Sequence, residues 1–525
     1  MNLPDPCKQM LQNFKNIAVV SLSTVGSRLL GLLRDILIFA ALGASLWNSA
    51  FILAFTLPNL FRRLLGEGAL SSAIVPVFSD VLERDGRNGA FRFFNQVLAR
   101  LLLALVIIIS LGMLLMAWAA GSDFLPGRWS MGAGLAVWLM PYMLFICLAA
   151  IISAGLNLVG RFAVAASTPI LLNLAMIGAL AAGLCLDSDA ARLVYWLCGG
   201  VLFGGLLQLL LPAIDLMRQG WRPRLESEGG AALTELWQLF LPGLMGAAIL
   251  QINILISRLL AYSLDESAVS VLYLASRLME LPLGVFTIAV ATVFFPLLAK
   301  ALSNHDETAF SAAFLKGLRL IVGISLPAGI GLFVLGEPII ELLFFWGAFE
   351  QADVLATVPL LAIYGLGLPF YSAATFATRG LHASKDMRTP VRVAAYCLLI
   401  NLFFGLLLMQ FWDAAGLAAA NVLAAFAQSW LLWRTLSSRR PAISYRALRP
   451  ALFKVLLAGV SMGLFCAFAW SFMVGFELND KLSAALSVTV CVPGGAIVYF
   501  TLLYLLRFEE LATLKAMLLN YMPKR

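Results

Sequence analysis

Charged residues are scarce in this sequence. Asp, Glu, Lys and Arg together make up 12% of its 525 residues, whereas hydrophobic residues make up 62%. Soluble domains carry about 25% charged residues, so this composition excludes an ordinary soluble protein. Apolar runs long enough to cross a hydrocarbon layer of about 30 Å recur along the whole chain, and no gap between them could hold a soluble domain. The sequence therefore predicts an all-α polytopic membrane protein.

Motifs for catalysis and metal binding are also lacking. The two histidines, His305 and His382, fall in predicted loops, and the seven cysteines are scattered without any CxxC spacing. HExxH, Walker A and Gly-rich dinucleotide motifs are absent. We therefore expect no catalytic residue, no metal site, no disulfide framework and no cofactor. Without an ATP site, any driving force must come from an ion gradient, the membrane potential, or substrate supply and removal.

The apolar runs are what the sequence does contain, and they predict about fourteen transmembrane helices. We place them at residues 17–42, 48–66, 94–120, 132–157, 162–186, 192–216, 236–262, 268–298, 312–336, 354–380, 390–411, 414–436, 451–475 and 482–506.

The net charge of +8 does not indicate nucleic-acid binding, because the distribution of the basic residues is explained by the orientation of the chain in the membrane. Most of the 36 Lys and Arg fall in loops on one side of these spans and at both termini, whereas the other side holds only Arg128, Arg192 and Lys481. By the positive-inside rule, both termini are cytoplasmic.

The second half of the chain echoes the first at an offset of about 220–230 residues. Six spans separate the copies, and because six is even, both halves enter the membrane in the same orientation. This predicts two six-helix lobes related by a parallel pseudo-twofold repeat, with two extra C-terminal helices, which is a transporter architecture. The predicted domains are residues 1–220, 221–440 and 441–525, the last ending in a short amphipathic helix at 508–522. The matching segments are Ser27-Arg28-Leu29-Leu30 with Ser257-Arg258-Leu259-Leu260, Pro141-Tyr142 with Pro369-Phe370, Gly155-Leu156 with Gly380-Leu381, and Thr168-Pro169 with Thr389-Pro390.

Several cations lie inside the predicted spans. A charged side chain at the bilayer centre costs about 2.5–3.5 kcal/mol on insertion scales, so it usually faces a polar cavity or a partner. Arginine offers a planar fork of donors that matches phosphate oxygens. The candidate substrate-binding residues are Arg28, Arg34, Arg62 and Arg277, a set that would suit a diphosphate.

Polar neighbours accompany these arginines. Helical spacing places Arg28, Gly31 and Asp35 on one stripe of the first span, with Ser27 in the adjacent column. Arg277 and Glu280 are i, i+3 neighbours that can pair. The supporting residues are Ser27, Gly31, Asp35, Asn59, Glu67 and Glu280. The alternative is that the arginines reach toward the membrane interface, which we expect for Arg63 and Arg258.

Prolines at span ends predict broken helices. Pro58 and Pro76 flank the end of the second span, and Pro282 and Pro296 lie within or near the end of the eighth, where each can kink the helix or break its hydrogen-bond ladder.

The motifs around these residues resemble the MurJ/MviN family of the multidrug, oligosaccharidyl-lipid and polysaccharide exporter superfamily. The similarity runs in order over nearly the whole chain. It is carried by Ser27-Arg28-Leu29-Leu30-Gly31 with Arg34-Asp35, Leu57-Pro58-Asn59-Leu60-Phe61-Arg62-Arg63 with Glu67-Gly68-Ala69, Arg277-Leu278-Met279-Glu280 with Pro282, Trp346-Gly347-Ala348-Phe349, and Asp386 with Arg388-Thr389-Pro390-Val391.

The resemblance implies a function. It implies a lipid II flippase that moves the undecaprenyl-diphosphate-linked peptidoglycan precursor from the inner to the outer leaflet of the bacterial inner membrane by alternating access, for cell-wall synthesis. The essential family arginines fall on Arg28, Arg34, Arg62 and Arg277. The resemblance also implies lipid II, membrane lipids and peptidoglycan synthesis proteins as partners, and a groove for the prenyl tail along the last two helices.

The chain departs from the family pattern at several positions. Many members carry Asp at the position of Ser49 and Lys at that of Thr56. Relatives that bind sodium use carboxylates where this chain has Ser257 and Gly405, near Asn401. Because both carboxylates are absent, we do not expect sodium to bind at this site, and the membrane potential is the expected driving force.

Other functions compete with this interpretation. An exporter of another lipid-linked oligosaccharide would share the arginines, whereas an exporter of amphipathic cationic drugs should carry intramembrane acids in their place. A membrane glycosyl- or acyltransferase would need a catalytic acid or histidine at the membrane surface. A scaffold would not need costly charges within its spans.

Overall fold

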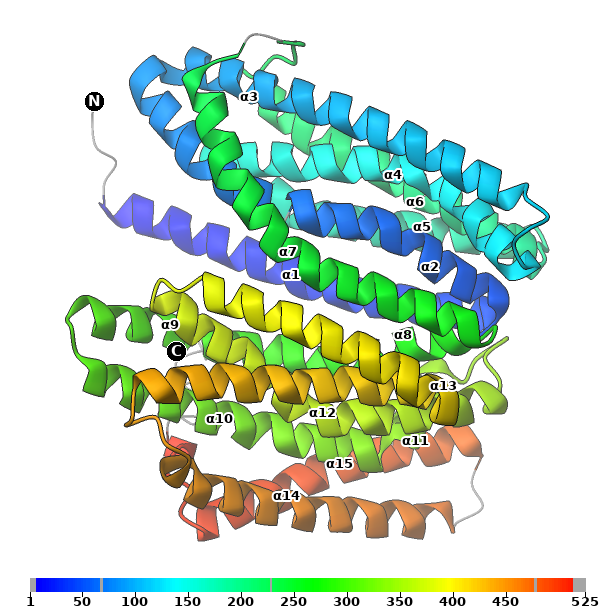
Figure 1. Cartoon of the computed structure of the whole chain (residues 1–525). Coiled ribbons are helices and arrows are strands. Elements are labelled where there is room, and N and C mark those ends of the chain that lie inside the picture. Colours follow the sequence, from blue (N-terminus) through cyan, green and yellow to red (C-terminus); the bar gives the residue numbers. More distant parts are fainter. Residues whose placement is uncertain (1–5, 67–68, 227–228, 476–478, 513–525) are drawn as a thin grey trace. The chain divides into compact units, whose positions relative to one another are not determined.

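The computed structural model describes residues 6–66, 69–226, 229–475 and 479–512, and within these ranges the regular structure is helical, with no strand (Figure 1). The helices are α1 (Pro6–Leu42), α2 (Leu46–Phe61), η1 (Arg62–Gly66), α3 (Ala69–Ala120), α4 (Gly127–Leu158), α5 (Phe162–Cys185), α6 (Ala190–Arg218), α7 (Ala231–Leu264), α8 (Ala268–Pro282), η2 (Leu283–Thr287), α9 (Ile288–Ser303), α10 (Glu307–Val334), α11 (Gly336–Phe344), α12 (Gln351–Ala383), α13 (Arg388–Arg439), α14 (Tyr445–Val474) and α15 (Asp480–Leu505).

The predicted all-α membrane architecture is confirmed. Eleven helices in the described part of the chain are long and apolar enough to cross a membrane. The eleven include α13 once, although its 52 residues hold two predicted spans. Its backbone leaves helical geometry at Trp412 and at Asp413, where φ is +45°, and Gly416 beyond this turn lies against the carbonyl of Leu408 before it. The chain therefore turns back within α13, and each of the fourteen predicted spans falls on helix.

One predicted loop is helical. The sequence places no span between residues 66 and 94, yet α3 begins at Ala69. Its first part buries Ile74, Val77, Phe78 and Val81, whose spacing is that of one helix face. The helix bends at Gly86, where φ is +69°, a conformation that glycine adopts without strain.

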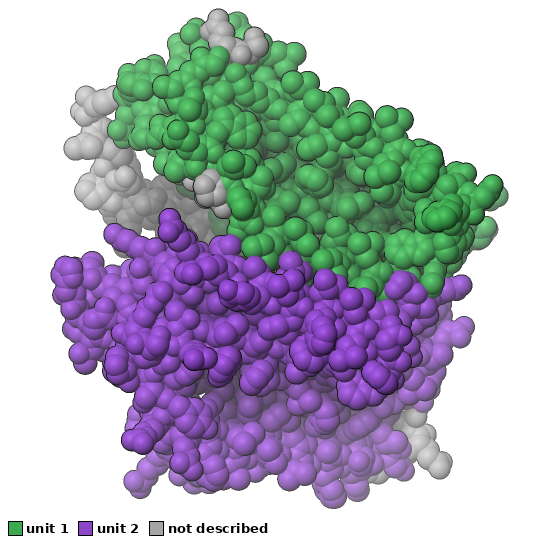
Figure 2. Space-filling view, viewed as in Figure 1, with its two compact units in different colours: residues 1–262 green, residues 263–525 purple. Residues whose placement is uncertain are grey.

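The helices group into two compact units, residues 1–262 and 263–525, coloured separately in Figure 2. In unit 1, α4 is the central helix, with α2, η1, α3 and α6 packed around it. Buried polar groups are satisfied there: the amide of Gln208 accepts a hydrogen bond from the Tyr142 hydroxyl and donates one to the carbonyl of Thr168. The boundaries of the two predicted lobes, after residues 220 and 440, stay predictions.

Unit 2 is built around α12, against which α8, α9, α10, α11 and α13 pack. Helices α10 and α12 approach closely where Gly329 meets Gly365: a Cβ built on Gly329 would lie 2.2 Å from the Gly365 carbonyl oxygen. Phenylalanines fill the adjacent core, with the rings of Phe314 and Phe376 stacked 5.2 Å apart. Helices α14 and α15 pack against each other, and α14 also packs on α10.

The segment after α15 is fixed to α10. The Arg319 guanidinium on α10 donates to the Glu510 carboxylate at 3.1 Å, Phe508 is buried, and the Tyr499 hydroxyl on α15 donates to the Gly323 carbonyl at 2.6 Å. The predicted amphipathic helix at 508–522 is described only as far as residue 512, so most of it lies outside the described residues.

Candidate functional site

The two arginines of α1 lie in different environments. Arg28 is exposed, and no described hydrogen bond or ion pair holds its guanidinium. Arg34 lies about 9 Å further along the helix axis, and only 11% of its side chain is exposed. Gly31 between them and Asp35 beyond them are buried. Arg28 is therefore open to a ligand, whereas Arg34 is enclosed by protein.

Arg34 is held by a hydrogen-bonded network between α1 and α5. Its Nη2 and Nε donate to Asp35 Oδ1 at 2.6 Å and 3.0 Å, and its Nη1 donates to Asn173 Oδ1 at 3.1 Å. The Asn173 amide in turn donates to the backbone carbonyl of Ser27 at 3.1 Å. Asp35 is 2% exposed, so the pair is buried and each charge depends on the other. The network fixes the guanidinium of Arg34 and ties the start of the arginine-bearing segment to α5.

Asn173 was absent from the predicted site. The sequence offers only a weak signal for it, a lone amide within the apolar run of α5. Buried amides require partners, but the partner across 139 residues of chain becomes visible only in the structure.

Arg62 stands at the point where α2 changes its winding. The α-helix runs to Phe61, and residues Arg62–Gly66 form a π-turn that packs on α3 and α4. Pro58, which lacks a backbone N–H, lies one turn before this change. The Arg62 Nε faces the Asn59 side-chain oxygen at 3.4 Å, and Asn59 donates to the carbonyl of Phe55. Such π-turns are frequent at functional sites. The predicted supporting residue Glu67 lies outside the described residues.

Arg277 of unit 2 stands on α8 with its predicted neighbour. Its Nη1 lies 3.4 Å from Glu280 Oε2, and the side chains are 32% and 50% exposed. The helix passes into a second π-turn at Leu283–Thr287, directly after Pro282. The two π-turns begin at Arg62 and Leu283, an offset within the 220–230 range of the sequence repeat.

Arg258 differs from its prediction. The sequence predicts that it extends to the membrane interface, but its Nη1 donates a hydrogen bond to Thr56 Oγ1 on α2. Four residues later, the Tyr262 hydroxyl donates to the carbonyl of Arg128. The end of α7 is therefore anchored to α2 and α4 within unit 1, and Arg258 places a further cation beside α2.

The arginines of each unit can bind an anion. Unit 1 presents Arg28 in the open, Arg62 at a π-turn and a fixed cation at Arg34, while unit 2 presents the partly exposed Arg277. Guanidinium groups bind phosphate oxygens with paired hydrogen bonds and stay protonated at all physiological pH values.

Comparison with protein families and curated proteins gives a consistent match. Residues 38–482 match the family model described as "Lipid II flippase MurJ". The chain is 36% identical over 433 residues to the "Probable lipid II flippase MurJ" of Rhizobium meliloti, covering 80% of each protein. It is 33% identical to the protein of the same description from Haemophilus influenzae, covering 84% of this chain and 89% of that one. The "Lipid II flippase MurJ" of Burkholderia cenocepacia is 29% identical and is covered to 98%.

Solved structures show the same fold. A lipid II flippase MurJ in an inward closed conformation superposes with a TM-score of 0.76 at 24% identity, covering 92% of this chain and 98% of that one. An inward-facing multidrug transporter of the MATE family in the MOP superfamily superposes with a TM-score of 0.65 at 13% identity, covering 79% and 95%.

Proposed function

The chain belongs to the lipid II flippase MurJ family, and from this premise we propose that it moves lipid II from the inner to the outer leaflet of the bacterial inner membrane, for cell-wall synthesis. It is a multi-pass membrane protein of a transporter fold, and the proposed activity is transport by alternating access without a catalytic step. The observation that supports this most strongly is the retention of arginines within membrane helices, one of them openly exposed. Lipid II offers a diphosphate to such donors.

The four arginines have two different roles in this proposal. Arg28, Arg62 and Arg277 bind the diphosphate, and Arg34 contributes a fixed positive charge, held by Asp35 and Asn173. Glu280 pairs with Arg277 when the substrate is absent. It releases Arg277 when the diphosphate arrives, since the contact between the two side chains is long and exposed. The predicted lobes, residues 1–220 and 221–440, move relative to each other, and residues 441–525 are the appendage.

The membrane potential drives the cycle. The diphosphate carries about two negative charges, and moving one charge across 100 mV is worth about 2.3 kcal/mol, so a potential that is negative inside favours export of the anion. The same potential favours return of the empty, positively charged carrier. Both termini are cytoplasmic in this proposal, and sodium is not required because Ser257 and Gly405 offer no carboxylate beside Asn401.

The test is complementation in cells depleted of their own flippase, with lipid II assayed on each leaflet. Arg28→Ala, Arg62→Ala and Arg277→Ala should each abolish or strongly reduce export at normal protein level, and Arg→Lys should rescue only in part because the paired hydrogen bonds are lost. Arg63→Ala is the matched control, because Arg63 is an exposed neighbour of Arg62 that we expect to face the cytoplasm. Export by two or more of the alanine variants at the parent rate would contradict the diphosphate site.

The driving force is tested separately. Collapsing the potential with a potassium ionophore should stop export while ATP is intact, and replacing sodium by potassium at constant potential should not. A saturable sodium requirement would contradict the proposed coupling.

A further inference from the structure

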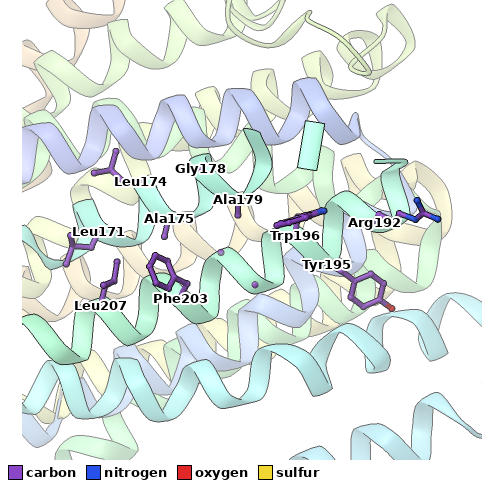
Figure 3. A pocket seen from close by; sticks show the side chains of 12 residues that line it. Leu171, Leu174, Ala175, Gly178, Ala179, Arg192, Tyr195, Trp196, Phe203 and Leu207 are labelled. Carbon is purple, nitrogen blue, oxygen red and sulfur yellow. The ribbon is translucent and has the colours of Figure 1, made fainter. Parts of the chain in front are cut away.

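An apolar groove of about 850 Å³ runs between α5 and α6 of unit 1 (Figure 3). Its walls are large side chains, with Leu171 and Leu174 on α5 and Phe203 and Leu207 on α6. Figure 3 shows Arg192 and Tyr195 together at one end of the groove and the leucines at the other. The groove thus has an apolar body and a single cationic end.

Small residues create the hollow. Gly200 and Gly204 let the two helices meet: a Cβ on Gly200 would lie 2.7 Å from the Cβ of Ala179, and one on Gly204 would lie 3.0 Å from that of Ala175. Gly178 and Gly199 also line the groove, but a Cβ on either would meet nothing within 4 Å. The first two glycines serve helix packing, whereas the second two leave space that the fold does not use.

The groove faces away from the arginine network. Asn173, which holds Arg34, and Gly178 are five residues apart on α5, so they point about 140° away from each other at 100° per residue. Leu174 and Phe203 in the groove are 51% and 57% exposed. Exposed leucine and phenylalanine on a membrane helix face hydrocarbon, so this surface is suited to lipid chains and not to the polar substrate path.

The dimensions and the charge indicate the occupant. From Trp196 to Leu207 the groove runs about 16 Å along α6, close to the half-thickness of a hydrocarbon core of about 30 Å. Arg192 lies one turn beyond Trp196, where a headgroup would be. The only described hydrogen bond of Asp189 with Arg192 is to its backbone N–H, at the helix cap, so the guanidinium remains available to a phosphate.

We propose that this groove binds one anionic phospholipid, with an acyl chain between α5 and α6 and its phosphate on Arg192. The site belongs to the leaflet on the side of Arg192, which the charge distribution makes the extracytoplasmic one. Tyr195 and Trp196 suit this position, because aromatic side chains with a polar group gather at membrane interfaces. The bound lipid would fill the space above Gly178 and Gly199 and complete the packing of α5 on α6.

Titration of the purified full-length chain in detergent with dioleoyl-phosphatidylglycerol, read by native mass spectrometry, tests the site. The double variant Gly178→Leu with Gly199→Leu fills the groove at positions with free space, and Arg192→Glu reverses its charge. Each should weaken the tightest phosphatidylglycerol site about tenfold, comparable to the loss of one charge-assisted hydrogen bond. The matched controls are Gly134→Leu, an equally open glycine on α4, and Arg218→Glu at the other end of α6, and neither should change the affinity.

A second readout locates the lipid. Phosphatidylglycerol brominated near the headgroup end of its acyl chains should quench the fluorescence of Trp196, which is the part of the signal that Trp196→Phe removes. The double variant Gly178→Leu with Gly199→Leu should abolish that quenching. Unchanged affinity in both groove variants would overturn the proposal. So would equal binding of dioleoyl-phosphatidylcholine, displacement by undecaprenyl phosphate at lower concentration than phosphatidylglycerol, or a dimer that dissociates only in the groove variants.

Discussion

Two arginine–acid pairs stand in predicted membrane spans of the chain, one in each unit, and their environments differ. Arg34 and Asp35 are 2.6 Å apart with 11% and 2% of their side chains exposed, whereas Arg277 and Glu280 are 3.4 Å apart with 32% and 50% exposed. Burial makes the first pair interdependent, since neither charge can find water if the other is removed. The second pair can exchange partners at little cost. The same residue types therefore serve as a fixed cation in one place and an exchangeable one in the other.

Removing the acids should give the largest difference between the pairs. Asp35→Ala leaves Arg34 buried without its carboxylate and should destabilise the protein by about 3–5 kcal/mol, whereas Glu280→Ala should cost about 1 kcal/mol or less. Thermal unfolding in detergent, with the protein level in membranes, measures both. Equal stability of the two variants would contradict the difference between a buried, interdependent pair and an exposed, exchangeable one.

Removing the cations should separate activity from stability. Arg277→Ala should lower lipid II export about tenfold or more, as loss of a charge-assisted hydrogen bond predicts, and leave the unfolding temperature unchanged. Arg34→Ala should lower both, because it leaves Asp35 buried and unpaired. The two quantities should be measured on the same preparations, and an Arg277→Ala protein that exports normally would contradict its assigned role.

The hydrogen bond between Arg34 and Asn173 should contribute less to stability than the ion pair between Arg34 and Asp35. Asn173→Ala removes one hydrogen bond to Arg34 and one to the Ser27 carbonyl, and should cost about 1–3 kcal/mol. Asn421→Ala is the control, because the only described hydrogen bond of Asn421 is to a carbonyl of its own helix. Thermal unfolding of both variants decides whether the network extends to α5.

A third ion pair, Asp386 with Arg439, lies outside the predicted membrane spans, and its removal should have the smallest effect on stability. Burial alone would raise the pKa of Asp386, but hydrogen bonds from Thr389 and Arg439 outweigh burial and hold this pKa well below its ordinary range. A carboxylate with a lowered folded-state pKa stabilises the protein above its unfolded pKa of about 3.9, and this stabilisation is lost as the pH falls further. Asp386→Asn should therefore flatten the loss of stability below about pH 4. An unchanged pH profile in the variant would mean that this pair contributes nothing measurable.

The sequence predicted the helices better than it predicted which side chains contact each other across helices. Apolar runs located the fourteen spans because each must cross hydrocarbon on its own, and prolines marked both places where a π-turn follows. The first part of α3 was missed because its apolar face is narrower than a membrane span requires. Partners distant in the chain, such as Asn173 for Arg34 and Thr56 for Arg258, could not be predicted, since helical spacing fixes the face of a residue but not the helix it meets.

The π-turn after α8 has a consequence for chain length. A π-turn holds one residue more than regular winding needs, so the chain can lose one residue within Leu283–Thr287 while α8 and α9 keep their faces. A deletion elsewhere in this continuous helix would rotate everything beyond it by about 100°, turning Phe294 out of the core. Among relatives that differ in length by a single residue in this region, the gap should therefore fall at residues 283–287.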